Sequence, residues 1–247
     1  MKIITLGTGH GDATVSNASS ATLIECGGKY YLIDCADGTE QRLLQAGVEP
    51  ASISAVFLTH THLDHSAGLP NLLKRFIKFK HYGRLPEAEM KCYLPDMRAA
   101  QIIKDWIKLN FFWEYLQFFD SADGFSDGTL SLRAFPNRHL GENGKSYSYK
   151  VSAGGKTVFF TGDLSDDFSD FDLAEANHCD IVISEMTHFP VDKALDLLKD
   201  LKCGKLVFNH IGDPYQHISA QEKVLQQLSA GLPCPVQFAF DGMSFEI

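Results

Sequence analysis

The stretch that most constrains this chain is Thr59-His60-Thr61-His62-Leu63-Asp64-His65, here called the histidine loop, which gathers three imidazoles and a carboxylate. It follows an apolar run, residues 53–58, that predicts a short buried strand. Gly68 and Pro70, residue types that are typical of turns and loops, follow soon afterwards. Hydrated groups at the rim of a core are costly unless something binds them. Because imidazole and carboxylate ligands suit zinc, iron or manganese, the histidine loop predicts a metal site.

Composition limits the classes of protein that fit. The 247 residues allow one large domain or two small ones, and the hydrophobic fraction of 45% is ordinary for a globular core. The net charge of −9 argues against a broad nucleic-acid-binding surface, although a local basic patch stays possible. We find no signal-peptide pattern and no apolar run long enough to cross a bilayer. We therefore expect a cytoplasmic protein without membrane contact.

The six cysteines show no Cys-x-x-Cys spacing, and none lies where a metal motif needs a ligand. They are predicted to be small buried hydrophobic residues in a reducing compartment.

Three further polar residues each come directly after a strand-like apolar run. His139 follows residues 130–135, Asp163 ends the run 158–163, and His210 ends the run 206–210. Each would be a weak signal alone. Together with the histidine loop, in this order, they form a strong signal.

In this arrangement the chain resembles the metallo-β-lactamase superfamily, whose signature is His-x-His-x-Asp-His. The resemblance covers nearly the whole sequence. It implies an α/β fold, an αββα sandwich of two mixed β-sheets with helices on the outside and metals at one edge. We expect one domain over residues 1–247, in which the helical segment of about 66–120 is a candidate cap over the site.

The resemblance also implies a ligand set. His60, His62 and His139 would hold one ion, Asp64, His65 and His210 a second, and Asp163 would bridge both. Two divalent ions are expected, with zinc favoured and manganese or iron as alternatives. Such a pair lies roughly 3.5–4 Å apart and carries a bridging hydroxide that acts as the nucleophile. Asp64 would also be catalytic, because its carboxylate could aim that hydroxide.

Within the superfamily, the chain is most similar to the ribonuclease Z and phosphodiesterase branch. The shared segments are Gly7-Thr8-Gly9, Asn17 to Ser20, and the turn Asp34 to Thr39. It departs from that branch by lacking the tRNA-gripping arm, since only 23 residues separate His139 from Asp163. A small anionic substrate is therefore expected rather than a folded tRNA. A homodimer is left open.

A general acid is sought between Asp163 and His210. The segment Ser184-Glu185-Met186-Thr187-His188 resembles the branch's His-Glu-Ala-Thr motif, with Ser184 in place of the first His. Glu185 matches that motif, whereas His188 lies just beyond it. We predict that His188 is the general acid and that Glu185 orients it. The alternative is a surface histidine that happens to follow a strand.

These observations favour a dinuclear metal-dependent hydrolase that cleaves a phosphodiester, small or nucleotide-like, with a metal-bridging hydroxide. The alternatives are an ester, thioester or lactone hydrolase of the same fold, and a ribonuclease Z-like RNA endonuclease. A non-catalytic scaffold is least favoured, because all seven ligands are present. Residues that bind the substrate are not identified.

Two stretches have open roles. An amphipathic helix over 72–80 carries a basic side that continues beyond it, made of Lys74, Arg75, Lys78, Lys80, His81 and Arg84. This basic rim is either a solvated face or an attractor for an anionic substrate. The aromatic stretch 111–119 could be core, a lip over the site or a dimer face.

The remaining elements follow from periodicity and turn residues. Thr39 is expected to be the N-cap of a helix. The residues around Asp241-Gly242 are expected to join a closing pair of strands, 236–240 and 244–247. The other expected strands are 2–6, 20–26, 29–35, 91–94, 146–152, 156–160, 180–184 and 205–208, and the other expected helices are 97–109, 191–201 and 219–228.

Overall fold

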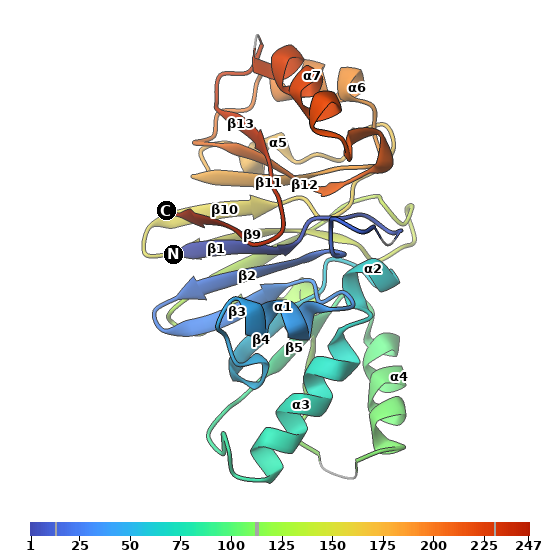
Figure 1. Ribbon diagram of the computed structural model, residues 1–247, viewed down its shortest axis with the longest axis vertical. Helices are drawn as coiled ribbons and strands as arrows, with labels where there is room; N and C mark the ends of the chain where they lie inside the picture. Colours follow the sequence, from blue (N-terminus) through green and yellow to red (C-terminus); the bar gives the residue numbers. More distant parts are fainter. Residues whose placement is uncertain (13, 112–113, 230) are drawn as a thin grey trace.

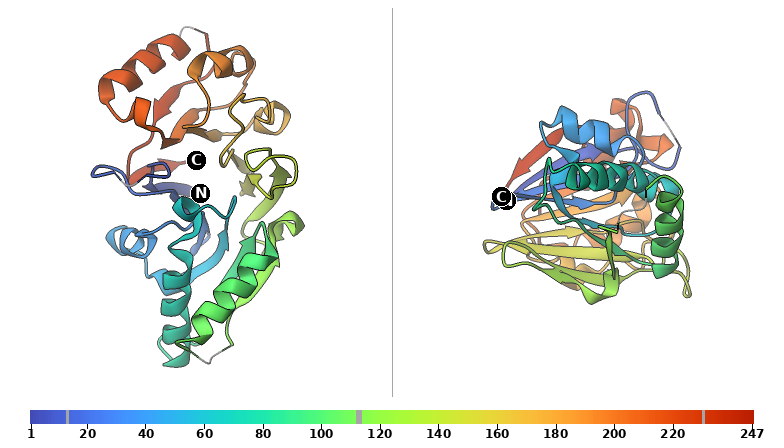
Figure 2. Two further views of the ribbon diagram at one scale, coloured as in Figure 1. Left: turned by 90° about the vertical axis from the view of Figure 1, so that its right-hand side faces the viewer. Right: turned by 90° about the horizontal axis from the view of Figure 1, so that it is seen from below.

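The computed structural model describes residues 1–12, 14–111, 114–229 and 231–247. Within these residues, two seven-stranded β-sheets pack face to face and helices cover their outer faces (Figures 1 and 2). This architecture is the expected αββα sandwich. Both sheets are mixed, because each joins a set of antiparallel strands to a set of parallel ones.

The first sheet comes from the amino-terminal half and the last strand of the chain. Its order is β14-β1-β2-β3-β4-β5-β6, and the strands from β3 to β6 run parallel. The strand bounds are β1 (Lys2–Gly7), β2 (Ala21–Cys26), β3 (Lys29–Ile33), β4 (Ile53–Phe57), β5 (Lys91–Leu94), β6 (Gln117–Asp120) and β14 (Met243–Glu246). Its helices are α1 (Thr39–Gln45), α2 (Leu63–Ser66), α3 (Leu69–His81) and α4 (Met97–Lys108).

The second sheet has the same plan. Its order is β13-β12-β11-β10-β9-β8-β7, and the strands from β10 to β13 run parallel. The strand bounds are β7 (Phe125–Ser126), β8 (Ser131–Pro136), β9 (Tyr147–Ala153), β10 (Lys156–Phe160), β11 (Ile181–Met186), β12 (Leu206–Ile211) and β13 (Val236–Phe238). Its helices are α5 (Leu173–Ala176), α6 (Val191–Leu198) and α7 (Ile218–Ser229). The described residues of the two halves also contain the short 3₁₀ helices η1 (Pro50–Ser52), η2 (Ser121–Asp123) and η3 (Asp213–Tyr215).

Strand alternation builds three layers of core. On β1, Ile3 points between the sheets while Ile4 points to the helices on the outside. The central layer also holds Phe57 and Tyr149, both fully buried. The outer layers pack α1, α3 and α4 on the first sheet and α5, α6 and α7 on the second. Burial on both faces explains why the central strands are apolar almost throughout.

The described aromatic residues of the stretch 111–119 are partly buried and pack against the core. Phe111 and Tyr115 pack against the outer layer of the first sheet, as does Phe118 of β6. Phe119 points to the opposite face of β6 and joins the central layer. Phe112 and Trp113, which belong to the same stretch, lie outside the described residues.

Two local expectations are wrong. Gly38 caps α1 with a left-handed backbone (φ 80°), and Thr39 is instead the first helical residue, whose Oγ1 donates to the carbonyl of Ala36 at 2.7 Å. The last two strands do not pair with each other. β13 lies parallel to β12 in the second sheet, whereas β14 lies antiparallel to β1 in the first. The turn at Asp241 therefore carries the chain from one sheet to the other.

Parallel strands place the carboxyl ends of β3, β4, β10, β11 and β12 on one edge of the sandwich. Loops that leave parallel strands at their carboxyl ends meet at that edge. The histidine loop follows β4 and the chain around Asp163 follows β10, so both reach this edge. Figure 1 shows α2 at the edge and α3 leading away from it toward the far end of the molecule.

Candidate metal centre

The histidine loop begins where β4 ends and passes into the single turn of α2. His60 is fully buried and His65 nearly so, whereas the His62 side of the loop faces outward. Asp64 and His65 lie within α2, so this short helix sets the direction of both side chains. The predicted loop is therefore partly helical.

The structure forms a first ligand group from His60, His62 and His139. Their ring nitrogens all lie within 4.8 Å of one another, close enough for one ion. His139 Nε2 and His62 Nδ1 are 3.3 Å apart. His139 comes from the loop after β8 and is steadied through its Nδ1, which is 3.3 Å from the carbonyl of Leu164.

A second ligand group consists of Asp64, His65, Asp163 and His210. Their donor atoms also lie within 4.8 Å of one another. Asp163, His65 and His210 are buried, and Asp64 is partly exposed. Thus the structure brings together all seven residues that the sequence predicted as ligands, in two adjacent groups.

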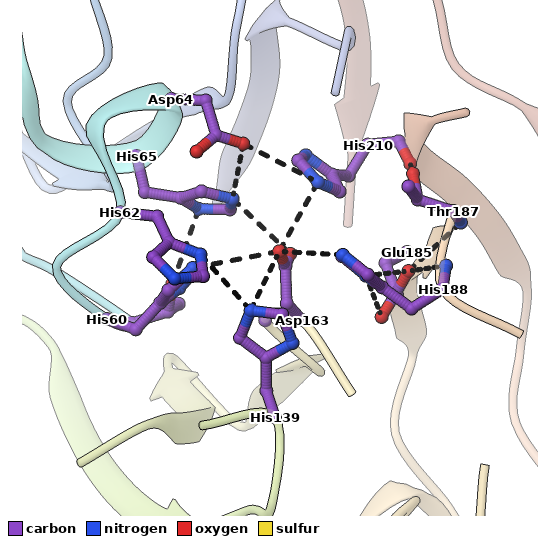
Figure 3. Close-up of polar contacts among 12 residues, drawn as sticks. His60, His62, Asp64, His65, His139, Asp163, Glu185, Thr187, His188 and His210 are labelled. Carbon is purple, nitrogen blue, oxygen red and sulfur yellow. Dashed lines mark hydrogen bonds and ion pairs between the residues drawn. The ribbon is translucent and has the colours of Figure 1, made fainter. Parts of the chain in front are cut away.

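Asp163 lies at the hub of the two groups, as Figure 3 shows. Its Oδ1 is 3.3 Å from His65 Nε2, and its Oδ2 is 3.3 Å from His210 Nε2. The same Oδ2 is 3.7 Å from both His60 Nε2 and His139 Nε2. One carboxylate therefore faces both groups, which is the placement that a bridging ligand needs.

Unpartnered buried atoms indicate that this donor set fits a metal. Among the described residues, His60 Nε2 is buried without a hydrogen-bond partner. His65 Nε2 and Asp163 Oδ1 are also buried and face each other at 3.3 Å, but they form no well-aligned hydrogen bond. Leaving such groups unpaired costs roughly 1–3 kcal/mol each. Divalent ions accept imidazole nitrogen and carboxylate oxygen, so bound ions would satisfy all three atoms.

A second layer of contacts orients His65. Its Nδ1 donates to Asp34 Oδ2 at 2.8 Å, which leaves Nε2 directed at Asp163. Asp34 Oδ1 also accepts from the backbone N–H of Thr59 at 2.7 Å. Asp34 itself has a left-handed backbone (φ 61°). Such a conformation persists where contacts with the surrounding residues hold it in place. Carboxylates in this position fix the tautomer and the ring orientation of a metal-binding histidine.

Sequence reasoning did not assign Asp34 to the site. The available signal was its place in the Asp34–Thr39 turn directly after β3, the strand beside β4. Only the pairing of these two strands brings its carboxylate under the histidine loop.

His188 and Glu185 form a close pair beside Asp163. His188 Nδ1 lies 2.9 Å from both carboxylate oxygens of Glu185, and His188 Nε2 points to Asp163 Oδ2 at 3.9 Å. Backbone N–H groups of Leu164, Thr187 and His188 also donate to Glu185, so its carboxylate is held firmly. Burial alone would lower the pKa of His188, but the hydrogen bond and charge of Glu185 outweigh it and raise that pKa.

The chain around His210 is held from several sides. His210 has a left-handed backbone (φ 47°), and its carbonyl accepts a hydrogen bond from Thr187 Oγ1. The next residue, Ile211, donates its N–H to the carbonyl of Thr8 at 2.8 Å. Beyond it, Asp213 Oδ1 is 2.9 Å from Nε2 of His10, a residue that the sequence analysis did not consider. The loop after β1 therefore braces the last predicted ligand.

The basic rim lies away from this centre. Arg75 pairs with Glu40 and Glu49, and Lys80 donates to the carbonyls of Pro86 and Ala88. α3, which carries these side chains, runs away from α2 (Figure 1). Its position favours a solvated and internally paired face over an attractor for the substrate.

Fold and site together define a metallo-β-lactamase-fold protein with a centre rich in histidine and aspartate. The chain belongs to the family described as anti-Pycsar protein Apyc1, which matches residues 1–223.

Solved structures share the fold along the whole chain. The metallo-β-lactamase fold protein YhfI from Bacillus subtilis superposes with a TM-score of 0.81 at 20% identity, covering 100% of this chain and 99% of that one. The short form of human tRNase Z gives a TM-score of 0.76 at 21% identity, over 100% and 99% of the two chains. A diphosphatase from the PhnP family gives 0.74 at 20% identity, over 100% and 97%.

Curated relatives match over shorter segments. Ribonuclease Z of Methanocaldococcus jannaschii is 32% identical over 118 residues, which is 48% of this chain and 35% of that protein. The human zinc phosphodiesterase ELAC protein 1 is 37% identical over 73 residues, which is 30% of this chain and 20% of that protein. The chain thus matches about a third or less of the length of these relatives. Among the described residues, no helix combines the length and the apolar character needed to cross a membrane.

Proposed function

We propose that this protein is a dinuclear metal-dependent hydrolase that cleaves a small or nucleotide-like phosphodiester. The observation that carries the proposal is the Asp163 carboxylate, which lies within 3.7 Å of ring nitrogens from both ligand groups. A carboxylate shared in this way suits two ions that act on one phosphoryl centre. Similarity to proteins named ribonuclease Z, zinc phosphodiesterase and diphosphatase supports the same reaction class.

In this proposal, His60, His62 and His139 hold one ion, and Asp64, His65 and His210 hold the other, with Asp163 between them. When bound, the two ions would polarise the phosphoryl oxygen and lower the pKa of a water molecule to near neutrality. Asp64 is the one partly exposed member of its group, so its carboxylate can accept a hydrogen bond from the attacking water and orient it.

We infer that His188 protonates the leaving oxygen. Glu185 holds its Nδ1, so the other nitrogen, Nε2, faces Asp163 and is available to a substrate at the centre. In the metal-free protein, burial would lower the pKa of His188, but the hydrogen bond and charge of Glu185 outweigh it and raise that pKa, which favours the protonated form that a general acid requires. We therefore assign His188 as general acid and Glu185 as the residue that positions it.

Compact chain topology favours a small substrate over a folded tRNA. The segment between His139 and Asp163 consists of a short loop followed by the hairpin of β9 and β10, whose turn is Gly154-Gly155. This segment is therefore too short to contain a protruding arm as well. The net charge of −9 also disfavours a long nucleic-acid contact.

The first experiment is hydrolysis of bis(p-nitrophenyl) phosphate by protein loaded with zinc or with manganese, with Asp64→Ala prepared in the same way. Metal analysis should find two ions per wild-type chain. Turnover that disappears in the variant supports the proposal. Absence of turnover with both ions present would overturn the phosphodiester assignment, and lactones and thioesters would then be tested.

The general acid needs a second substrate, because p-nitrophenolate departs without protonation near neutral pH. We expect His188→Ala to reduce turnover of an alkyl or ribose phosphodiester by roughly 10²–10⁴-fold, and that of bis(p-nitrophenyl) phosphate far less. If turnover of the alkyl ester stays within about twofold of wild type while metal content holds, His188 is not the general acid.

A further inference from the structure

Three cysteines gather at the end of the second sheet opposite the metal centre. Cys179, Cys203 and Cys234 each come shortly before a strand, respectively β11, β12 and β13. These strands are parallel neighbours, so their amino ends lie side by side. Backbone contacts confirm the register: Gly204 N–H donates to the carbonyl of Cys179, and Leu206 N–H donates to that of Pro235, both at 2.9 Å. The metal centre uses the carboxyl ends of the same sheet.

Within this cluster, Cys203 and Cys234 form a pair. Their sulfur atoms are 3.4 Å apart. Cys179 is turned elsewhere, with its Sγ 3.3 Å from the carbonyl of Glu175. Sequence spacing gave no sign of the pair, since its members are 31 positions apart in the chain.

Access to the pair is uneven. Cys203 is half-buried and lines an open surface hollow together with Lys202 and Pro233, whereas Cys234 is only 7% exposed. A small reagent would therefore meet Cys203 first, with Cys234 directly behind it.

We propose that Cys203 and Cys234 are a modification site that forms a reversible disulfide with a low-molecular-weight disulfide as the oxidant. The Cys203 thiolate attacks one sulfur of the reagent, which breaks the reagent's S–S bond and releases one thiolate. The Cys234 thiolate then attacks Cys203 Sγ and releases the second. Two protein thiols are oxidised, one reagent disulfide is reduced to two thiols, and both thiol protons leave with them.

The geometry needs little adjustment. The two sulfurs would approach from 3.4 Å to about 2.05 Å, a small movement for side chains at the ends of strands. Burial, followed by the neighbouring thiol of Cys234, raises the pKa of Cys203. Because the thiolate is the attacking form, the reaction should accelerate as pH rises.

A bridge here would close a loop that contains β12, η3 and α7, including His210. Cross-linking such a loop restricts the unfolded chain and thereby stabilises the fold. For a loop of this size, we expect the melting temperature to rise on the order of 5–15 °C. The disulfide would thus lock the unit that carries the last predicted metal ligand without touching the centre itself.

The test is incubation of the reduced, full-length protein with glutathione disulfide at several pH values, followed by intact mass and peptide mapping. We expect loss of two hydrogen atoms per chain, a Cys203–Cys234 cross-linked peptide, and reversal by dithiothreitol. Cys203→Ser and Cys234→Ser should abolish the cross-link. Cys26→Ser is the matched control, since Cys26 is also half-buried but lies in β2 of the other sheet.

Any of four results would overturn the proposal. They are no loss of two hydrogen atoms at any pH, a stable glutathione adduct on Cys203 without closure of the bridge, a bridge to Cys179 in its place, and a cross-link between two chains. The wild-type peptide map distinguishes these results even if a serine variant folds poorly. A melting temperature that does not rise on oxidation would remove the proposed stabilising consequence.

Discussion

The two ligand groups differ in how firmly the protein holds them. In the first group, His62 is exposed, and His139 is steadied by one carbonyl at 3.3 Å. In the second group, His65 is clamped between Asp34 and Asp163, and His210 is braced by Thr187 and by the backbone near Thr8. Preorganised ligands lose less freedom on binding. The comparison teaches that the contacts behind the ligands, and not only the ligands themselves, set the affinity, and we expect the second group to bind its ion more tightly.

The largest effect should come from the carboxylate that both groups share. Asp163→Asn removes a negative charge from the hub, so both ions should be lost together. Substitution of a residue that only hydrogen-bonds to a metal ligand costs about 10–100-fold in metal affinity. Because Asp163 is itself a predicted ligand, its substitution should lower metal affinity and turnover by more than about 100-fold. Isothermal titration with manganese and elemental analysis measure it. Asp166→Asn, at an exposed acid nearby, is the control, and loss of only one ion would contradict the shared role of Asp163.

Asp34→Asn should separate the two groups. Asparagine tolerates the left-handed backbone at this position, so the change acts on the contact with His65 and not on backbone strain. We expect affinity for the second ion to fall roughly 10–100-fold, while the first ion is held almost as before. Asp37→Asn, on the same turn but exposed, should change neither affinity. Equal weakening of both sites would show that the contact between Asp34 and His65 does not act on the second group alone.

The pH dependence of metal uptake should differ between the groups. In the metal-free protein, burial would lower the pKa of His65, but the charges of Asp163 and Asp34 outweigh it and raise that pKa well above its usual value. Burial lowers the pKa of His60 and of His139. An ion in the second group must therefore displace a proton from His65, whereas His60 and His139 are already neutral.

Consequently, affinity of the second group should rise about tenfold per pH unit below the raised pKa of His65, and affinity of the first group should change less. Titration in buffers of different ionisation enthalpy counts the protons released at each step. The predicted direction is confirmed if the first group has the higher metal affinity at low pH and the second group has the higher metal affinity at high pH. Identical proton release at both steps would contradict it.

The smallest effect should come from the ion pair at the rim of the second group. Asp213→Ala removes the acceptor of His10 Nε2, but the Asp213 side chain is 76% exposed. Exposed pairs contribute about 0–1 kcal/mol, so unfolding free energy and metal affinity should change little. Chemical denaturation measures the first and metal titration the second. A large loss would mean that His10 and Asp213, and not the buried backbone contacts, hold His210 in place.

The sequence by itself placed four of the seven predicted ligands together and indicated the class of fold. Four of the predicted ligands lie in one short stretch after an apolar strand, so local spacing alone places them together. Most elements followed from periodicity, because buried strands and amphipathic helices leave clear patterns. The αββα sandwich followed from the metallo-β-lactamase resemblance.

Only the tertiary structure decided how residues from distant parts of the chain reach those four ligands. Asp163 lies in the loop after β10, whereas Glu185 and His210 lie in β11 and β12, and they meet because these three strands are parallel neighbours. The same pairing at the other end of the strands brings Cys203 to Cys234. Asp34 reaches His65 because β3 pairs with β4, and β13 and β14 separate into different sheets. Strand pairing joins residues that are remote in the chain, and no local pattern records which strands will pair.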